Sequence, residues 1–110
     1  MSFSSGVPGG LPTPIAVTTV AATSRTLRRA DNGTLLYFTA GSAVTLTVPA
    51  GLGRGFNCLI VQGGAGAVTP TASGTTIENR SSFTETAGQY ALCTLVAVAA
   101  DTFIFAGDGA

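Results

Sequence analysis

The sequence predicts an all-β fold, namely a single β-sandwich, jelly-roll-like or barrel domain of about eight short antiparallel strands with an extended N-terminal arm. Segments rich in β-branched and aromatic residues recur at short, regular spacing, and turn-forming residues separate them. Glycine recurs throughout and most other positions are β-branched or small, which disfavours a helix of ordinary length. The length of 110 residues suits one domain.

Residues 1–24 are predicted to form the arm. They hold three of the five prolines and no charged side chain. The stretch 6–14 can be neither regular helix nor central strand, because proline lacks the N–H donor and glycine is too free. Residues 15–20 are β-prone and could add to a sheet edge, either their own or a neighbour's. A flexible terminus is the alternative, although a solvated tail would more often be charged.

The β domain is expected to span residues 25–110. Its predicted strands are 26–29 (alternatively one helical turn), 34–39, 44–48, 56–62, 67–71, 75–79, 89–100 and 102–106. The 44–48 segment alternates cleanly, which places Val44, Leu46 and Val48 in the core. The continuous apolar run 56–62 predicts a central strand that is buried on both faces. Pro70 predicts that its strand lies at a sheet edge.

The composition excludes several functions. Only 9% of residues are charged, the net charge is zero, and the chain has no His and no Lys. Without these side chains, His-based acid–base catalysis and the Ser-Lys arrangement are excluded, and phosphate binding by clustered cations is disfavoured. The apolar run 91–100 is about half of the roughly 20 residues that a membrane helix needs. The start of the chain lacks a signal-peptide pattern, so synthesis in the host cytoplasm is expected.

Neither a catalytic nor a metal site is predicted, and no cofactor is expected. Glu78 and Glu85 lie near adjacent short strands, but solvated positions are the more ordinary interpretation for them. Cys58 and Cys93 lack zinc-site spacing and fall in apolar strands, so buried free thiols are favoured over a disulfide. The glycine-rich stretch 63–66 follows a strand, yet no G-x-G-x-x-G pattern runs through it and no helix follows. These glycines are therefore predicted to form a turn.

Several short motifs occur together in this chain. They are an Asp-x-Gly turn at 31–33, an alternating strand that ends in Thr-Val-Pro at 47–49, the string QGGAG at 62–66, GQYA at 88–91, and an aromatic strand that ends in Gly-Asp at 107–108. Over residues 26–108 this pattern resembles a small β module that recurs in structural proteins of tailed bacteriophages. The motifs are turn and core signals, so the resemblance implies a fold more than a role.

The resemblance implies two functions. Such modules occur in head decoration proteins and in tail-fibre or baseplate components, where the module lies within a longer chain. Because the module here makes up the chain apart from the arm, we expect a non-enzymatic decoration (cement) protein on the capsid exterior of the virion. It would be a homotrimer that binds the major capsid protein, with no nucleic acid or membrane partner. A tail-fibre or baseplate module that attaches to host glycans is the alternative.

The partner-binding residues are predicted from chemistry and position. In the arm, Val7, Leu11, Ile15 and Val17 would fill partner pockets or add as a strand. At the base of the arm, Arg25, Arg28 and Arg29 would contact acidic groups, and solvated arginines are an equally weighted alternative. A glycan site would require an exposed aromatic residue, but Tyr37 and Tyr90 lie in apolar strands and are expected in the core. The low charge is typical of a surface that partners cover.

Overall fold

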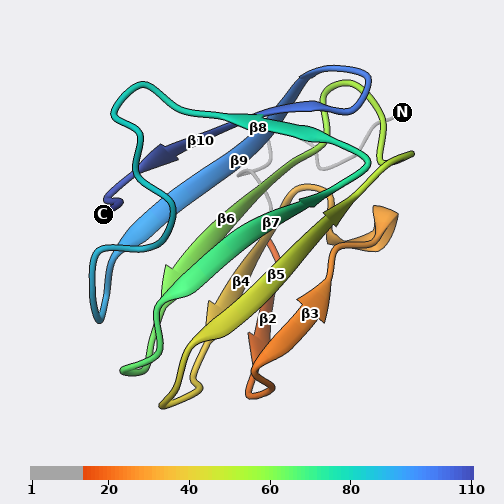
Figure 1. Cartoon of the computed structure of the whole chain (residues 1–110). Helices are drawn as coiled ribbons and strands as arrows, with labels where there is room; N and C mark the ends of the chain where they lie inside the picture. Colours follow the sequence, from red (N-terminus) through yellow and green to blue (C-terminus); the bar gives the residue numbers. More distant parts are fainter. Residues whose placement is uncertain (1–13) are drawn as a thin grey trace.

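The computed structural model describes residues 14–110, which form two β-sheets facing each other across a common core (Figure 1). One short 3-10 turn, η1, spans Arg29–Asp31. The strands are β2 (Val17–Val20), β3 (Ser24–Thr26), β4 (Thr34–Phe38), β5 (Val44–Pro49), β6 (Asn57–Gln62), β7 (Val68–Ser73), β8 (Thr76–Glu78), β9 (Leu92–Ala99) and β10 (Thr102–Gly107). The prediction of an all-β chain is confirmed over this range.

The first six strands alternate between the two sheets. Strands β2, β4 and β6 lie in a six-stranded sheet of order β2-β4-β6-β9-β10-β8, and β3, β5 and β7 form a three-stranded sheet. Each of the pairs β2–β3, β4–β5 and β6–β7 is thus one coil of the chain, and successive coils stack in parallel (Figure 1). After β7 the chain returns to the large sheet as β8, and the antiparallel hairpin β9–β10 fills the space between β6 and β8.

The predicted antiparallel arrangement is wrong for most of the molecule. Five strand pairings are parallel, and the antiparallel ones are β6–β9 and β9–β10. The stacking is solenoid-like and is neither a jelly roll nor a barrel. The physical reason is that a turn can join two strands of one sheet, as in a hairpin, or carry the chain into the facing sheet. Both arrangements leave the same alternation of apolar and polar residues in the sequence.

At the start of the described region, one of the two alternatives for the β-prone stretch is found. The β-prone stretch 15–20 adds to the edge of the chain's own sheet, since β2 pairs with β4 from Val17 opposite Leu35 to Val20 opposite Phe38. For residues 26–29 the sequence predicted either a short strand or one helical turn. The structure has a strand that ends at Thr26 (β3) and a 3-10 turn that begins at Arg29 (η1). Residues 14–24, predicted as part of the arm, therefore include all of β2 and the first residue of β3, and residues 1–13 lie outside the described residues.

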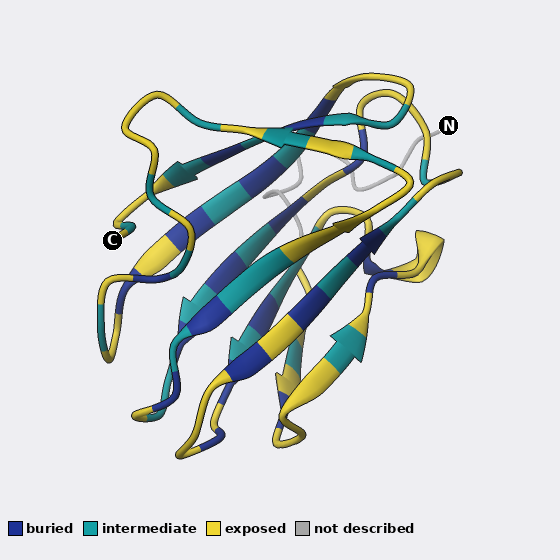
Figure 2. Cartoon of the chain, viewed as in Figure 1, coloured by how far each residue is buried: buried dark blue, intermediate teal, exposed yellow. Residues whose placement is uncertain are grey.

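The core lies between the two sheets, where inward-facing residues alternate with outward-facing ones (Figure 2). Val44, Leu46 and Val48 of β5 are buried as predicted. The largest fully buried apolar side chains are Phe38, Phe103, Phe105, Leu27, Leu36, Leu46, Ile60 and Leu95. Strand β6 is central, as predicted, but only one of its faces is fully buried, because Leu59 and Val61 on the outer face stay half-buried.

The glycine-rich stretch 63–66 is a turn, as predicted, and close packing explains its composition. A Cβ atom at Gly64 would collide with the backbone of Thr39 and Ala40, and one at Gly66 would collide with the carbonyl of Ser42. The turn after β6 thus packs directly on the turn after β4 in the coil beside it. Only glycine allows two backbones to approach this closely.

Candidate interaction surfaces

The outer face of the six-stranded sheet is mainly apolar, and its outward-facing polar residues include Thr19, Asn57 and Thr94. In register, Val17, Leu35 and Leu59 form one row across β2, β4 and β6, and Tyr37, Val61 and Leu92 form the next row across β4, β6 and β9. Val96 and Ile104 extend this surface over β9 and β10. We call these eight residues the outer apolar face. Val17 is 60% exposed and Leu92 is 50% exposed. A charged side chain on the outward side of the same sheet is Glu78, in edge strand β8.

The outer apolar face extends over five strands of the six-stranded sheet. With strands about 4.8 Å apart and residues about 3.3 Å apart, the part of the sheet that carries these eight residues has a geometric area of roughly 400 Å². Large exposed apolar patches often mark interaction sites. Nothing among the described residues covers the face. A partner that buries it would gain hydrophobic free energy without having to desolvate charges.

The predicted arginine cluster is divided between the interior and the surface. Strand β3 aligns Arg25 with the buried Leu46, so the Arg25 side chain points inward. Its Nη2 lies 2.7 Å from Oδ1 of Asp31, which is only 3% exposed. The second carboxylate oxygen of Asp31 accepts a hydrogen bond from the Arg28 N–H at 3.0 Å. This buried ion pair caps the core at the first coil, a structural role that the sequence analysis missed.

The remaining predicted contact residues lie at the surface. Arg28 is exposed, and so is Arg29, whose guanidinium donates to the Gly51 carbonyl at 3.2 and 3.1 Å. Ile15 is 48% exposed and adjoins the outer apolar face at β2. Val7 and Leu11 lie outside the described residues. The structure therefore brings Ile15 and Val17 together with the outer apolar face, and it separates Arg25 from the other two arginines.

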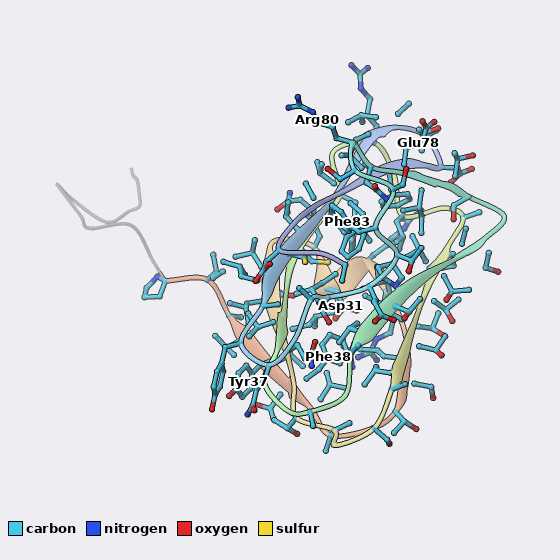
Figure 3. All side chains as sticks on the ribbon, turned by 60° about the vertical axis from the view of Figure 1, so that its left-hand side comes forward. Asp31, Tyr37, Phe38, Glu78, Arg80 and Phe83 are labelled. Atoms are coloured by element: carbon cyan, nitrogen blue, oxygen red, sulfur yellow. The ribbon has the colours of Figure 1, made fainter. Side chains whose placement is uncertain are left out.

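The expectation that both tyrosines lie in the core is wrong. Tyr37 is half-buried on the outer face, and its ring lies against Gly63, where a Cβ atom would collide with it. Figure 3 shows Tyr37 at the periphery, whereas Phe38 points into the interior. Tyr90 is 71% exposed and has a φ of 72°. The apolar run at 89–100 suggested a strand over its whole length, but β9 begins only at Leu92, so Tyr90 falls in the preceding turn.

Tyr90 stands beside a polar side chain. The turn is closed by a hydrogen bond from the Ala91 N–H to the Gly88 carbonyl at 3.0 Å, and the Tyr90 N–H donates to the Gln62 carbonyl at 2.5 Å. The Gln89 amide donates to the Gly63 carbonyl at 3.2 Å. These bonds fix the backbone of the turn, in which an exposed tyrosine directly follows an exposed glutamine in the sequence.

Both cysteines are free and buried, as predicted. The pKa of the Cys58 thiol is raised to about 12. Burial is the larger cause, and the negative charge of Asp31 adds to it. Burial also raises the pKa of Cys93, whose Sγ donates to the Asp108 carbonyl at 3.3 Å. Because the thiolate is the reactive form, neither thiol is suited to nucleophilic or redox chemistry at neutral pH.

The acidic residues do not form a site within residues 14–110. Glu78 is exposed and Glu85 is half-buried, and no group of three or more potential metal ligands occurs in this part of the chain. Among the described residues there is also no helix with the length and hydrophobicity that a membrane crossing requires. No family model, no curated protein and no solved structure matches this chain.

Proposed function

We propose that this chain is a non-enzymatic structural protein of a bacteriophage virion, most specifically a capsid decoration protein that binds the major capsid protein on the head exterior. The outer apolar face supports an assembly role, because a chain with 9% charged residues leaves this uncharged surface for a partner to cover. The assignment to a virion rests on the sequence motifs at 31–33, 47–49, 62–66, 88–91 and 107–108.

The contact with the capsid would begin where the arm meets the outer apolar face. Ile15 and Val17 are both exposed there, at the free edge of the six-stranded sheet, and Val7 and Leu11 precede them in the sequence. A capsid subunit that covers this region would bury apolar area on the sheet and on the arm together. Each bound copy would then stabilise the head by mass action.

Binding to heads assembled without the protein tests the proposal. The full chain should cosediment with heads and raise the temperature at which they rupture, whereas deletion of residues 1–14 or the double variant V17K/L92K should abolish cosedimentation. As a control, T45K places one lysine on the outside of the three-stranded sheet, where Thr45 is exposed, and should bind normally. Failure of the full chain to bind heads, or a label at the tail tip in electron microscopy of virions, would overturn the decoration role.

A tail-fibre or baseplate module that binds host glycans is the second candidate, and Tyr90 favours it. An aromatic ring that is 71% exposed beside the Gln89 amide provides both the stacking surface and the hydrogen-bonding group that sugars require. Titration of the full chain with bacterial surface oligosaccharides should then shift the NMR signals of residues 88–91, and Y90A should abolish the shifts. If no oligosaccharide shifts these signals, the glycan function is refuted.

A further inference from the structure

The free edge of β7 lies at the end of the solenoid opposite the first coil. The three-stranded sheet stops at β7, while the six-stranded sheet continues from β6 into β9, β10 and β8. Within residues 14–110, no strand pairs with the outer edge of β7. The position next to β6 in the six-stranded sheet is therefore filled by β9, whereas the corresponding position next to β7 in the three-stranded sheet is open.

The backbone groups at this edge can be assigned from the parallel ladder. The Ala67 carbonyl accepts from the Val44 N–H, so alternate residues of β7, beginning with Thr69, bond to β5. Val68, Pro70 and Ala72 consequently direct their backbone groups outward. Thr86 satisfies Val68, because its Oγ1 accepts from the Val68 N–H at 2.8 Å and its N–H donates to the Val68 carbonyl at 3.0 Å. The Pro70 carbonyl and the N–H and carbonyl of Ala72 remain directed at the open strand position.

A pocket opens beside these backbone groups. Its volume is about 240 Å³, and its walls come from Pro70 and Ala72 of β7, Ile77 and Asn79 at β8, and the rings of Phe83 and Phe105. The two rings meet edge to face with centroids 5.1 Å apart, and Phe105 is buried. Figure 3 shows Phe83 lying further inside the molecule than Glu78 and Arg80. None of the residues that line the pocket is charged.

One wall of the pocket contains a buried acceptor without a donor. The Asn79 Nδ2 donates to the Phe83 carbonyl at 2.6 Å, which fixes the orientation of the amide, because the flipped form would place oxygen against oxygen. The Asn79 Oδ1 is buried and has no hydrogen-bond partner among the described residues. Since an unsatisfied buried acceptor costs free energy, a bound group that displaces the Asn79 side chain enough to donate an N–H or O–H to Oδ1 gains more than an apolar group.

We propose that the free edge of β7 and this pocket bind an extended, uncharged segment of a partner protein. The segment adds as a strand along Pro70 and Ala72, and it inserts one aromatic side chain with a hydroxyl donor, tyrosine in preference to phenylalanine. Strand addition takes its affinity from backbone bonds and its specificity from such a pocket. The pocket is smaller than the roughly 300–1,000 Å³ of small-molecule sites, which suits a single side chain. This proposal does not depend on the virion function.

The test uses blocked peptides of sequence Thr-Val-Thr-X-Thr-Val-Thr, in which X is Tyr, Phe, Ala or Asp. Titrated into the full isotope-labelled chain, the Tyr peptide should bind most tightly and shift NMR signals at 68–73 and 77–84. The Ala and Asp peptides should bind at least about tenfold more weakly. Equal binding of all four peptides, no saturable binding of the Tyr peptide, or shifts centred on β2 would overturn the proposal. Binding of free p-cresol as tightly as the Tyr peptide would overturn the strand addition.

Two variants of one residue separate the edge from the pocket. A72L fills the pocket. A72P removes the outward N–H of Ala72 without removing a hydrogen bond to β5, because the backbone groups of Ala72 are directed away from β5. Each should weaken binding of the Tyr peptide at least about tenfold. T71V changes the exposed outer surface of the same strand and should bind as the unchanged chain does. If A72P fails to fold, A72L still decides the result: unchanged binding of the Tyr peptide to folded A72L would overturn the proposal.

Discussion

Tyr90 combines an exposed ring with a backbone conformation that favours glycine. Its φ of 72° lies in the left-handed region, which costs a residue with a Cβ atom about 1–2 kcal/mol. The exposed position offers no packing that would offset this cost. Strained backbone tends to occur at functional positions, which agrees with the glycan contact proposed for Tyr90.

Replacement of this residue by glycine should therefore stabilise the fold. We expect Y90G to raise the free energy of unfolding by up to about 1 kcal/mol, because relief of the strain exceeds the entropy that glycine loses on folding. Urea unfolding measures this change. Y90A is the matched control, since it removes the ring and keeps the strain, and it should give no comparable gain. A Y90G protein that is less stable than Y90A would contradict the interpretation.

The Cys58 thiol makes stability depend on alkaline pH. Its pKa is raised from 9.0 to about 12 in the folded chain. A raised pKa means that the stabilising contribution is fully present below about pH 9 and is lost as pH rises toward 12, at up to roughly 1.4 kcal/mol per pH unit. Urea unfolding at several values from pH 8 to 11 should show this decline, and C58A should show a shallower one. Parallel pH profiles for the two chains would rule out this role of Cys58.

Among the elements, the turn at 63–66 is the one whose packing tolerates least change. A Cβ atom at Gly66 meets the Ser42 carbonyl, and backbone cannot move aside as a flexible side chain can. G66A should therefore lower the free energy of unfolding by about 1–3 kcal/mol, the usual range for overpacking. G41A is the matched control, because Gly41 lies in the neighbouring turn, has open space around it and lacks a positive φ. Equal stability of the two variants in urea unfolding would show that the turns do not pack as described.

The segment from 83 to 91 is held to the coils by a buried polar contact. The Thr86 hydroxyl donates to Oε1 of the buried Gln62 at 2.5 Å and accepts from the Val68 N–H at 2.8 Å. T86V leaves both groups buried without a partner, so it should cost at least about 2 kcal/mol and increase hydrogen exchange across 83–91. T84V, at an exposed position in the same segment, should leave exchange unchanged. Exchange that is equally slow in T86V would refute the anchoring role of this contact.

The residues of a single strand were enough to predict the position and buried face of some elements, but they did not predict which strands pair with each other. The alternation at 44–48 and the proline at position 70 each report a property of one strand, and both predictions are confirmed. Whether β4 pairs with β5 or with β6 depends on residues of the next coil, so the parallel order was missed. The inward position of Arg25 likewise follows from its register with Leu46. Tyr90 was missed because its turn continues directly into the apolar sequence of β9.

For the molecule as a whole, the outer apolar face predicts self-association of the purified chain when no capsid subunit covers this face. A surface without charges carries no repulsion between copies, and the net charge of zero adds none. Sedimentation should therefore show association that depends on concentration, with a trimer as the state expected from the sequence. L92K should shift the protein toward monomer, and T45K, on the opposite side, should not. A fully monomeric chain at all concentrations would contradict this prediction.

The stacking of coils also fixes a distance between two ends of the molecule. The free edge of β2 lies at one end of the stack, and the open position beside β7 lies at the other, with complete coils between them. Each added coil would move these two ends apart by about 4.8 Å, the spacing of neighbouring strands, without changing either one. The distance between the two ends is therefore set by the number of complete coils. Duplication or loss of the β4–β5 coil would change the distance between the two proposed binding regions.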